Sequence, residues 1–138
     1  MSTQEHPARR AGLASQAAVR ARDKQAWLDL FAADGIVEDP IGPSGFDPEG
    51  KGHRGHEAIS AFWDKAIAAT ESIEFLFGDS FACGAEVAFT GTIRTTIGGH
   101  RIDAEGVFTY RVDAAGKIAA LRAYWEVDRA MATTKRID

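Results

Sequence analysis

"VFTYRVDAAGKIAALRAYWEV", residues 107–127, is the stretch that decides the fold. It holds two runs of β-branched and aromatic residues on either side of the turn sequence DAAG at 113–116, a pattern typical of two antiparallel strands. Similar runs precede it at 72–84 and 85–97, and the pair GG at 98–99 supplies another turn signal. The C-terminal half is therefore expected to form a meandering antiparallel sheet.

The N-terminal half has a helical pattern instead. Residues 8–21 are rich in alanine, Asp23 is placed to cap a second helix, and residues 56–70 carry apolar side chains at helical spacing. An extended segment at 35–39 ends at Pro40, which holds the residue before it out of helical dihedrals. Helices that precede such strands indicate an α+β fold, in which three N-terminal helices pack on a strongly curved mixed or antiparallel sheet and close an apolar cone.

The length and composition suit a single domain spanning 1–138, with flexible ends expected at 1–7 and 129–138. The formal net charge of −4 argues against nucleic acid and anionic membranes, because both bind basic faces. Cys83 is the only cysteine, which suits a reducing compartment, and it is expected to pack in the interior. No apolar run is long enough to span a membrane, so the expected location is the cytoplasm.

The segment GIVEDPIG, residues 35–42, places Asp39 at the end of an apolar run and at the start of a glycine-rich loop. If Asp39 faces an apolar pocket, desolvation raises the pKa of its carboxyl and makes it a better base near neutral pH. The alternative is a solvated acid at the end of a strand. Glu38 points the opposite way on an extended strand, so a structural or solvated role is expected for it.

Alternation along residues 101–112 predicts one wall of the pocket. One set of alternate positions is apolar or aromatic and is expected to face inward: Ala104, Gly106, Phe108 and Tyr110. The other set is more polar and is expected on the outer face: Asp103, Glu105, Val107 and Thr109. Gly91 and Gly106 interrupt their strands, which indicates either the close approach of a ligand or plain curvature of the sheet.

The loop after Pro40 contains potential metal ligands, but their spacing matches no recognised site. His53 and His56 lie three residues apart, and Asp47 or Glu49 could add a third ligand. A histidine that closes over a ligand and a solvated surface are both better interpretations, so no metal is expected. No glycine-rich phosphate motif connects a strand to a helix, and no cofactor is expected.

Three segments together resemble the ketosteroid isomerases of the NTF2-like, or SnoaL-like, superfamily: FAADGIVEDPIG at 31–42, HEAISAFW at 56–63, and the opening stretch at 107–127. The resemblance runs from about residue 15 to about residue 128. Those isomerases combine an aspartate base with two hydrogen-bond donors, a tyrosine and a protonated aspartate. The resemblance implies that Asp39 is the base and that a homodimer forms through the outer face of the sheet.

The same resemblance implies that both donors are replaced. Ser15 stands at the position of the tyrosine, and Phe108 stands at the position of the protonated aspartate. The aromatic residue of the third helix corresponds to Trp63, and Trp125 keeps the aromatic position beside the base. Loss of one such donor typically costs about 10²–10³ in rate. Substitute donors could be Ser15, Tyr110, an indole N–H or water, and Tyr110 is favoured because it lies on the inward set of positions.

The primary hypothesis is a steroid Δ-isomerase-like protein with an incomplete oxyanion hole, which binds a rigid, steroid-like apolar ketone or phenol. A non-catalytic binding protein for hydrophobic small molecules is the alternative, and a hydratase, dehydratase or hydrolase of the same fold is a third possibility. Asp39 is the predicted catalytic residue. The predicted ligand contacts are Ser15, Trp63, Phe89, Gly91, Phe108, Tyr110 and Trp125.

Overall fold

The computed structural model describes residues 6–137, so most of the flexible N-terminus expected at 1–7 lies outside the described residues. In chain order the elements are α1 (Pro7–Arg20), α2 (Lys24–Asp29), β1 (Phe31–Glu38), β2 (His53–Arg54), α3 (Gly55–Phe62), the π-helical turn η2 (Trp63–Ile67), β3 (Ser72–Cys83), β4 (Glu86–Ile97), β5 (His100–Val112), β6 (Ile118–Tyr124), α4 (Val127–Ala132) and β7 (Lys135–Arg136). The α+β prediction is confirmed.

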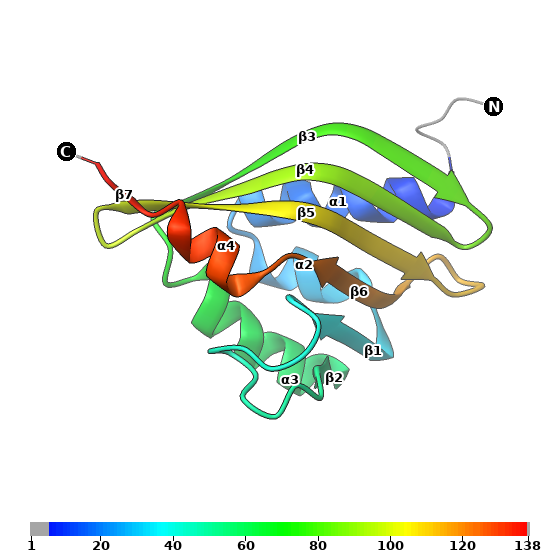
Figure 1. Ribbon diagram of the computed structural model, residues 1–138. Helices are drawn as coiled ribbons and strands as arrows, with labels where there is room; N and C mark the ends of the chain where they lie inside the picture. Colours follow the sequence, from blue (N-terminus) through cyan, green and yellow to red (C-terminus); the bar gives the residue numbers. More distant parts are fainter. Residues whose placement is uncertain (1–5, 138) are drawn as a thin grey trace.

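Within the described residues one sheet has the strand order β2-β1-β6-β5-β4-β3, and β7 pairs with β5. Neighbouring strands are antiparallel except β1 and β6, which run parallel. The long strands β3, β4 and β5 arch over α1, while α2 and α3 lie below them and α4 packs beside β5 (Figure 1). The sheet is curved and mixed, as the NTF2-like resemblance predicts.

Two interior glycines explain part of this curvature. Gly91 has φ +144 and lies opposite the irregularity of β3, where an added Cβ would collide with the Leu76 carbonyl oxygen. An added Cβ at Gly106 would collide with the Tyr124 carbonyl oxygen of β6. Both glycines therefore mark the close approach of a neighbouring strand. Of the two explanations that the sequence left open, sheet curvature and the close approach of a ligand, this favours sheet curvature.

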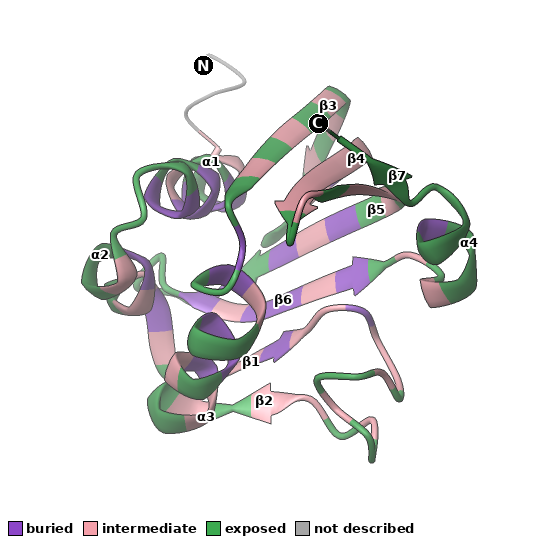
Figure 2. Cartoon of the chain, turned by 90° about the vertical axis from the view of Figure 1, so that its left-hand side faces the viewer, coloured by how far each residue is buried: buried purple, intermediate pink, exposed green. Residues whose placement is uncertain are grey.

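Local signals fix the ends of the first two helices. The His6 ring accepts a hydrogen bond from the Ala8 N–H at 3.1 Å, and Pro7 occupies the first turn of α1. Asp23 Oδ1 accepts from the Ala26 N–H at 3.1 Å, so the predicted cap of α2 is confirmed. Buried residues concentrate on the sheet-facing side of α1 and along β1 and β6 (Figure 2).

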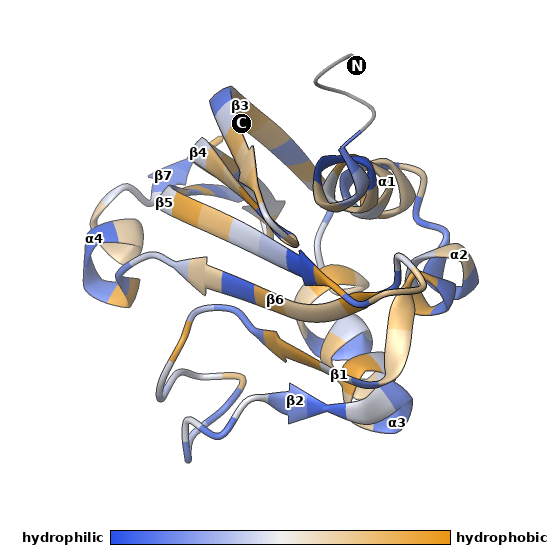
Figure 3. Ribbon diagram, turned by 90° about the vertical axis from the view of Figure 1, so that its right-hand side faces the viewer, coloured by the Kyte–Doolittle hydropathy of each residue, from blue (hydrophilic) through white to orange (hydrophobic). Residues whose placement is uncertain are grey.

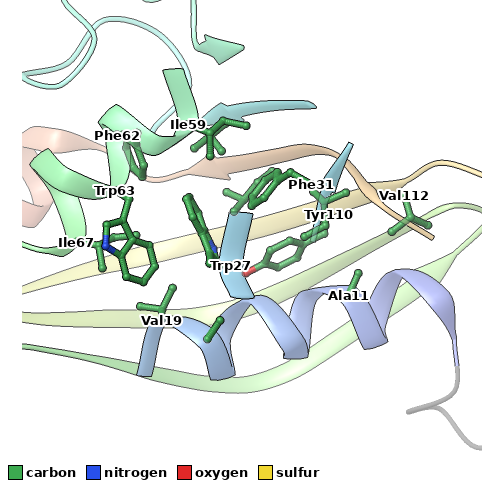
Figure 4. Packing of buried hydrophobic residues seen from close by; sticks show 14 of the residues in the cluster. Ala11, Val19, Trp27, Phe31, Ile59, Phe62, Trp63, Ile67, Tyr110 and Val112 are labelled. Carbon is green, nitrogen blue, oxygen red and sulfur yellow. The ribbon is translucent and has the colours of Figure 1, made fainter. Parts of the chain in front are cut away.

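The core is organised around Trp27, which is 1% exposed. Its ring centroid lies 4.8 Å from that of Phe31 and 5.3 Å from that of Trp63. Figure 4 shows Trp27 beside α1, with Trp63 on one side and Phe31 and Tyr110 on the other. The hydrophobic strand β1 is covered at its outer edge by the short hydrophilic β2, which protects the edge of the sheet (Figure 3).

Several elements differ from the sequence predictions. The third helix ends at Phe62 and continues as η2, and the first strand begins at Phe31, four residues earlier than expected. The segment 129–138 was expected to be a flexible tail, but it contributes to α4 and β7 because Ala130 is buried and residues 135–136 pair with β5. Cys83 is exposed rather than packed, since it ends β3 at the turn into β4.

No helix among residues 6–137 combines the length and the apolar character needed to cross a membrane.

Candidate ligand-binding and active site

A cavity of about 290 Å³ lies between the helices and the concave face of the sheet. Its wall is mostly apolar, and it draws residues from every layer of the fold. The polar side chains of the wall are Ser15, Asp39, Lys65, Thr70, Thr95 and Tyr110. The volume falls just below the range of about 300–1,000 Å³ typical of ligand pockets.

Asp39 reaches this cavity from the end of β1. The parallel pairing of β1 with β6 places Glu38 beside Arg122 and brings the following residue to the cavity. The indole Nε1–H of Trp125 donates a hydrogen bond of 2.7 Å to Asp39 Oδ1. Burial in the cavity wall raises the pKa of the carboxyl, while the hydrogen bond from Trp125 lowers it in part. Asp39 keeps some accessible surface because it faces the hollow.

Glu38 lies away from the cavity, as the alternation predicts. Its Oε1 accepts a hydrogen bond of 2.9 Å from Arg122 Nε, which joins β1 to β6. The two neighbouring acids therefore have different environments: Glu38 is paired with a cation, and Asp39 has a single neutral donor and an apolar hollow.

Tyr110 faces the same cavity from β5. Burial raises the pKa of its phenol to about 12, nearby Gln16 and Ser15 lower it, and the negative charge of Asp39 raises it further. The influence of Asp39 on this pKa indicates that the two groups share one polar region. The phenol stays protonated across the working range of pH, so it is able to donate a hydrogen bond.

Helix α1 is shaped to accommodate the Tyr110 ring. An added Cβ at Gly12 would lie 2.7 Å from Phe89 Cε2 and 2.8 Å from Tyr110 Cδ1. Ser15, one turn further along, is 2% exposed, and its Oγ accepts a hydrogen bond of 3.0 Å from Trp27 Nε1. Because the Ser15 oxygen accepts from Trp27, its own hydrogen is free to point toward Tyr110 or toward a ligand.

The structure brings five of the predicted site residues into the cavity wall: Asp39, Ser15, Phe108, Tyr110 and Trp125. Inward alternation on β5 is also observed, with Ile102, Ala104, Phe108 and Tyr110 in the wall. Phe108 is 2% exposed and brings a phenyl ring without a donor.

The other three predicted contacts lie outside the cavity wall. Trp63 is 4% exposed and packs on Trp27 in the core. Phe89 stands behind Tyr110, with ring centroids 5.7 Å apart, and lines a second hollow between α1 and β3. Gly91 belongs to the bend of the sheet. Sequence alternation identifies the face of a strand but not the depth at which the cavity ends. The sequence therefore could not distinguish these three residues from those that line the cavity.

Sequence reasoning missed contributions from the loop, η2 and α4. Phe46 lines the cavity from the loop after Pro40, and its ring packs edge-on against Phe62 at 6.2 Å. Lys65 and Met131 complete the wall. Phe46 is the only aromatic residue of its glycine- and proline-rich loop, which was a usable signal. Lys65 follows Phe62 by three residues and so shares its side of the helix.

The loop acids and histidines have other roles than holding a metal. Asp47 accepts hydrogen bonds from the backbone N–H groups of Gly50 and Gly52, at 3.1 and 2.7 Å. His56 Nε2 contacts the Phe31 carbonyl oxygen at 2.9 Å, and the His53 ring packs at a tilt against Phe62, with ring centroids 4.9 Å apart. Burial lowers the pKa of His53. Nowhere in residues 6–137 do three potential metal-ligating side chains gather.

Comparison with known proteins agrees with this geometry. The SnoaL-like domain family matches residues 13–121. The crystal structure of RV0760c from Mycobacterium tuberculosis has a TM-score of 0.84 and 38% sequence identity, covering 92% of this chain and 96% of that one. RV0760c is also known in complex with estradiol-17beta-hemisuccinate.

Two further structures are similar. The Delta 5-3-ketosteroid isomerase from Mycobacterium sp. has a TM-score of 0.84 and 36% identity, covering 94% of this chain and 98% of that one. An epoxide hydrolase of M. tuberculosis has a TM-score of 0.73 and 22% identity, covering 89% and 85%, and shares the fold alone. The family match extends over most of the chain, and the identity to RV0760c and to the isomerase exceeds one third. This protein belongs to the SnoaL-like family.

Proposed function

We propose that the protein binds a rigid, steroid-like ketone or phenol and acts as a Δ-isomerase with Asp39 as the base. The observation that carries this proposal is Asp39 itself, a carboxylate with a raised pKa that faces an apolar hollow and is held by the Trp125 indole. The similarity to a ketosteroid isomerase and to a protein crystallised with a steroid ester supports the class of ligand.

The reaction needs one base and no external reagent. The Asp39 carboxylate removes a proton from the carbon between the carbonyl and the β,γ double bond, and the electron pair moves into a dienolate. The protonated Asp39 then returns the proton to the γ carbon, which yields the conjugated enone and restores the carboxylate. Desolvation of Asp39 favours this exchange because it brings the pKa of the carboxyl closer to neutral pH.

Tyr110 is the proposed donor to the dienolate oxygen. Its phenol shares a polar region with Asp39, and its pKa of about 12 keeps it protonated. Ser15 accepts from Trp27 and lies beside the phenol, so the order Trp27 to Ser15 to Tyr110 forms a chain of donors directed into the cavity. In this arrangement the phenol that the related isomerases carry at the position of Ser15 is supplied by β5 instead.

A non-catalytic binding protein is the second candidate, and Phe108 favours it. This phenyl ring fills the position at which the isomerases carry a protonated aspartate, so the oxyanion would have at most one strong neutral donor from β5. A hydratase, dehydratase or hydrolase would need a second acid–base group beside Asp39. Among the described residues of the cavity wall there is no second carboxylate, and the likeness to an epoxide hydrolase concerns the fold.

A direct experiment separates the candidates. A 3-keto-Δ5-steroid is supplied, and the absorbance of the conjugated enone is followed for the wild type, for Asp39→Asn and for the exposed control Asp34→Asn. We expect turnover in the wild type and the control, and a fall of about 10²–10⁴ in Asp39→Asn. Quenching of tryptophan fluorescence without turnover in any protein would support the binding protein. Neither quenching nor turnover would overturn both.

The homodimer and the cytoplasmic location remain predictions. Exposed apolar side chains on the outer side of the sheet support pairing between copies of the chain: Leu76 at 44%, Val107 at 37% and Tyr124 at 49% exposure. Light scattering of the purified protein tests the dimer, and a charge placed at Val107 should convert the dimer to a monomer.

A further inference from the structure

The mouth of the cavity carries a cation that the proposed chemistry does not use. Among the wall residues, Phe46 is 42% exposed and Met131 is 48% exposed, and Lys65 is exposed as well. Wall residues that are also exposed mark the place where the cavity meets solvent. Lys65 therefore lies at the mouth, on the π-helical turn η2, whereas Asp39, Ser15 and Tyr110 lie in the interior.

The ammonium group of Lys65 has no ion-pair partner among residues 6–137. The neighbouring Asp64 is hydrogen-bonded to Lys24 at 2.9 Å, and the two acids of the loop after Pro40 are also engaged. Asp47 binds backbone N–H groups, and Glu49 lies 3.1 Å from Lys51. An unpaired cation beside an apolar cavity is available for a charge that arrives with a ligand.

Lys65 lies in a different part of the cavity wall from Asp39. Lys65 lowers the pKa of His53, whose ring packs against Phe62, so the ammonium lies on the side of the cavity formed by the loop and α3. The pKa of Asp39 is shifted by burial and by the hydrogen bond from Trp125, and that of Tyr110 by burial, Gln16, Ser15 and Asp39; Lys65 contributes to neither shift. Among the described wall residues, Asp39 carries the only carboxyl group and Lys65 the only amine.

We infer that Lys65 binds a carboxylate on the end of the ligand that projects from the cavity mouth, so that the substrates are amphipathic carboxylates with a rigid apolar body. The inference rests on the proposed function for the ketone or phenol end. Asp39 repels an anion from the interior, and Lys65 attracts it at the mouth, so the two charges give the ligand one orientation. A single ammonium suits a singly charged carboxylate better than a phosphate, which is typically bound by several donors.

A structural role predicts a different result. The methylene stem of a lysine often covers apolar surface while its charge remains in water. In that case a neutral side chain of similar length would preserve all binding, and the charge of the ligand would not matter. The decisive variant is therefore Lys65→Met, which keeps the stem and removes the charge.

The experiment measures dissociation constants by tryptophan fluorescence at neutral pH for two matched ligand pairs. The first pair is estradiol and estradiol 17β-hemisuccinate, and the second is decan-1-ol and decanoate, which tests the mouth without a steroid body. The proteins are the wild type, Lys65→Met, Lys65→Glu, and the control Lys51→Met, whose lysine is paired with Glu49 in the loop.

We expect Lys65→Met to weaken the two carboxylates by about fivefold, the upper end for a partly exposed ion pair, and to leave the neutral partners and Lys51→Met unchanged. Lys65→Glu should weaken the carboxylates by on the order of tenfold or more, and added salt should reduce both effects. Equal losses for charged and neutral ligands, or no loss for either carboxylate, would overturn the inference. If estradiol and decanol fail to bind the wild type, the proposed function fails, and decanoate still decides the role of Lys65.

Discussion

The cavity has two polar sides that are built in different ways. The acid side joins two adjacent strands: Asp39 follows β1 directly, and its parallel neighbour β6 leads into Trp125, which holds it at 2.7 Å. The donor side is assembled from distant parts of the chain, with Ser15 from α1, Trp27 from α2 and Tyr110 from β5. The first side is a short sequence motif with one partner, and the second exists only when three elements pack together.

This difference bears on how such a site changes. An acid at the end of a strand needs only its motif and one neighbouring donor to be held in place. A donor is defined by the place that its oxygen occupies and not by its position in the chain. Ser15 and Gly12 leave room on α1, and the Tyr110 ring from β5 fills that room. A phenol can therefore serve the same cavity from a different element.

The largest expected effect comes from removing the Tyr110 hydroxyl, the proposed donor on the second side of the cavity. If Tyr110 is the donor to the dienolate oxygen, Tyr110→Phe should lower the isomerisation rate by about 10²–10³. The control is Tyr124→Phe, which alters a tyrosine that is 49% exposed. The measurement is the rate of enone formation, with circular dichroism to verify the fold. An unchanged rate in Tyr110→Phe would remove the donor side from the mechanism.

The acid side is tested by Trp125→Phe. This change removes the hydrogen bond that lowers the pKa of Asp39, so the carboxyl should titrate at higher pH. A hydrogen bond to a charged group is worth about 1.5–3 kcal/mol, and the rate should fall on the order of tenfold. The pH–rate profile should rise with pH through the pKa of Asp39 and shift upward in the variant.

A double-variant cycle gives the control for that prediction. In the Asp39→Asn background, Trp125→Phe should have little further effect on the rate, because its partner is already neutral. Independent losses from the two changes would show that Trp125 acts through the wall of the cavity and not through the carboxylate.

The fit between α1 and β5 is tested by Gly12→Ala. The added methyl would lie 2.7 Å from Phe89 and 2.8 Å from Tyr110, and overpacking of this kind costs about 1–3 kcal/mol. The better helix propensity of alanine returns about 1 kcal/mol, so the free energy of unfolding should fall by about 1 kcal/mol. Urea unfolding measures it, and Gly45→Ala, which meets no atom within 4 Å, is the control. A gain in stability would show that the Tyr110 ring moves freely.

The smallest effect is a difference in thermal stability that depends on pH. Burial raises the pKa of Asp39 above its ordinary value of 3.8, so between the two values the folded protein binds more protons than the unfolded chain. The contribution of Asp39 to stability therefore falls as pH rises through that window. Asp39→Asn should melt at a higher temperature than the wild type at neutral pH, and the difference should vanish below pH 3.8.

An unchanged melting temperature at neutral pH would mean that the carboxylate is well solvated in the cavity. Glu38→Gln is a comparison variant for which the opposite change in stability is expected. It removes the hydrogen-bonded pair with Arg122, so it should lower stability at neutral pH instead of raising it.

The features that the sequence predicted correctly depend on interactions between residues that are close together in the chain. The Asp23 cap, the alternation along β5 and the residue before Pro40 each act over a few residues, and the structure contains all three features. The tail at 129–138 was mispredicted because its six-residue helix depends on burial of Ala130 against the cavity. Likewise, Phe89 and Phe108 lie on neighbouring strands with similar patterns, and only the depth of the hollow separates them.

The sequence alone determined that an acid would end the first strand and that an apolar wall would face it, because strand alternation and a proline act on adjacent residues. Strand alternation also favoured Tyr110 as a donor, but tertiary structure alone brought Tyr110 and Ser15 into one cavity with that acid and placed Lys65 at its mouth. Tyr110, Ser15 and Lys65 are far apart in the chain, and no short-range rule fixes the distances between them. Those distances follow from how closely α1, β5 and η2 pack, which depends on the shapes of all the side chains between them.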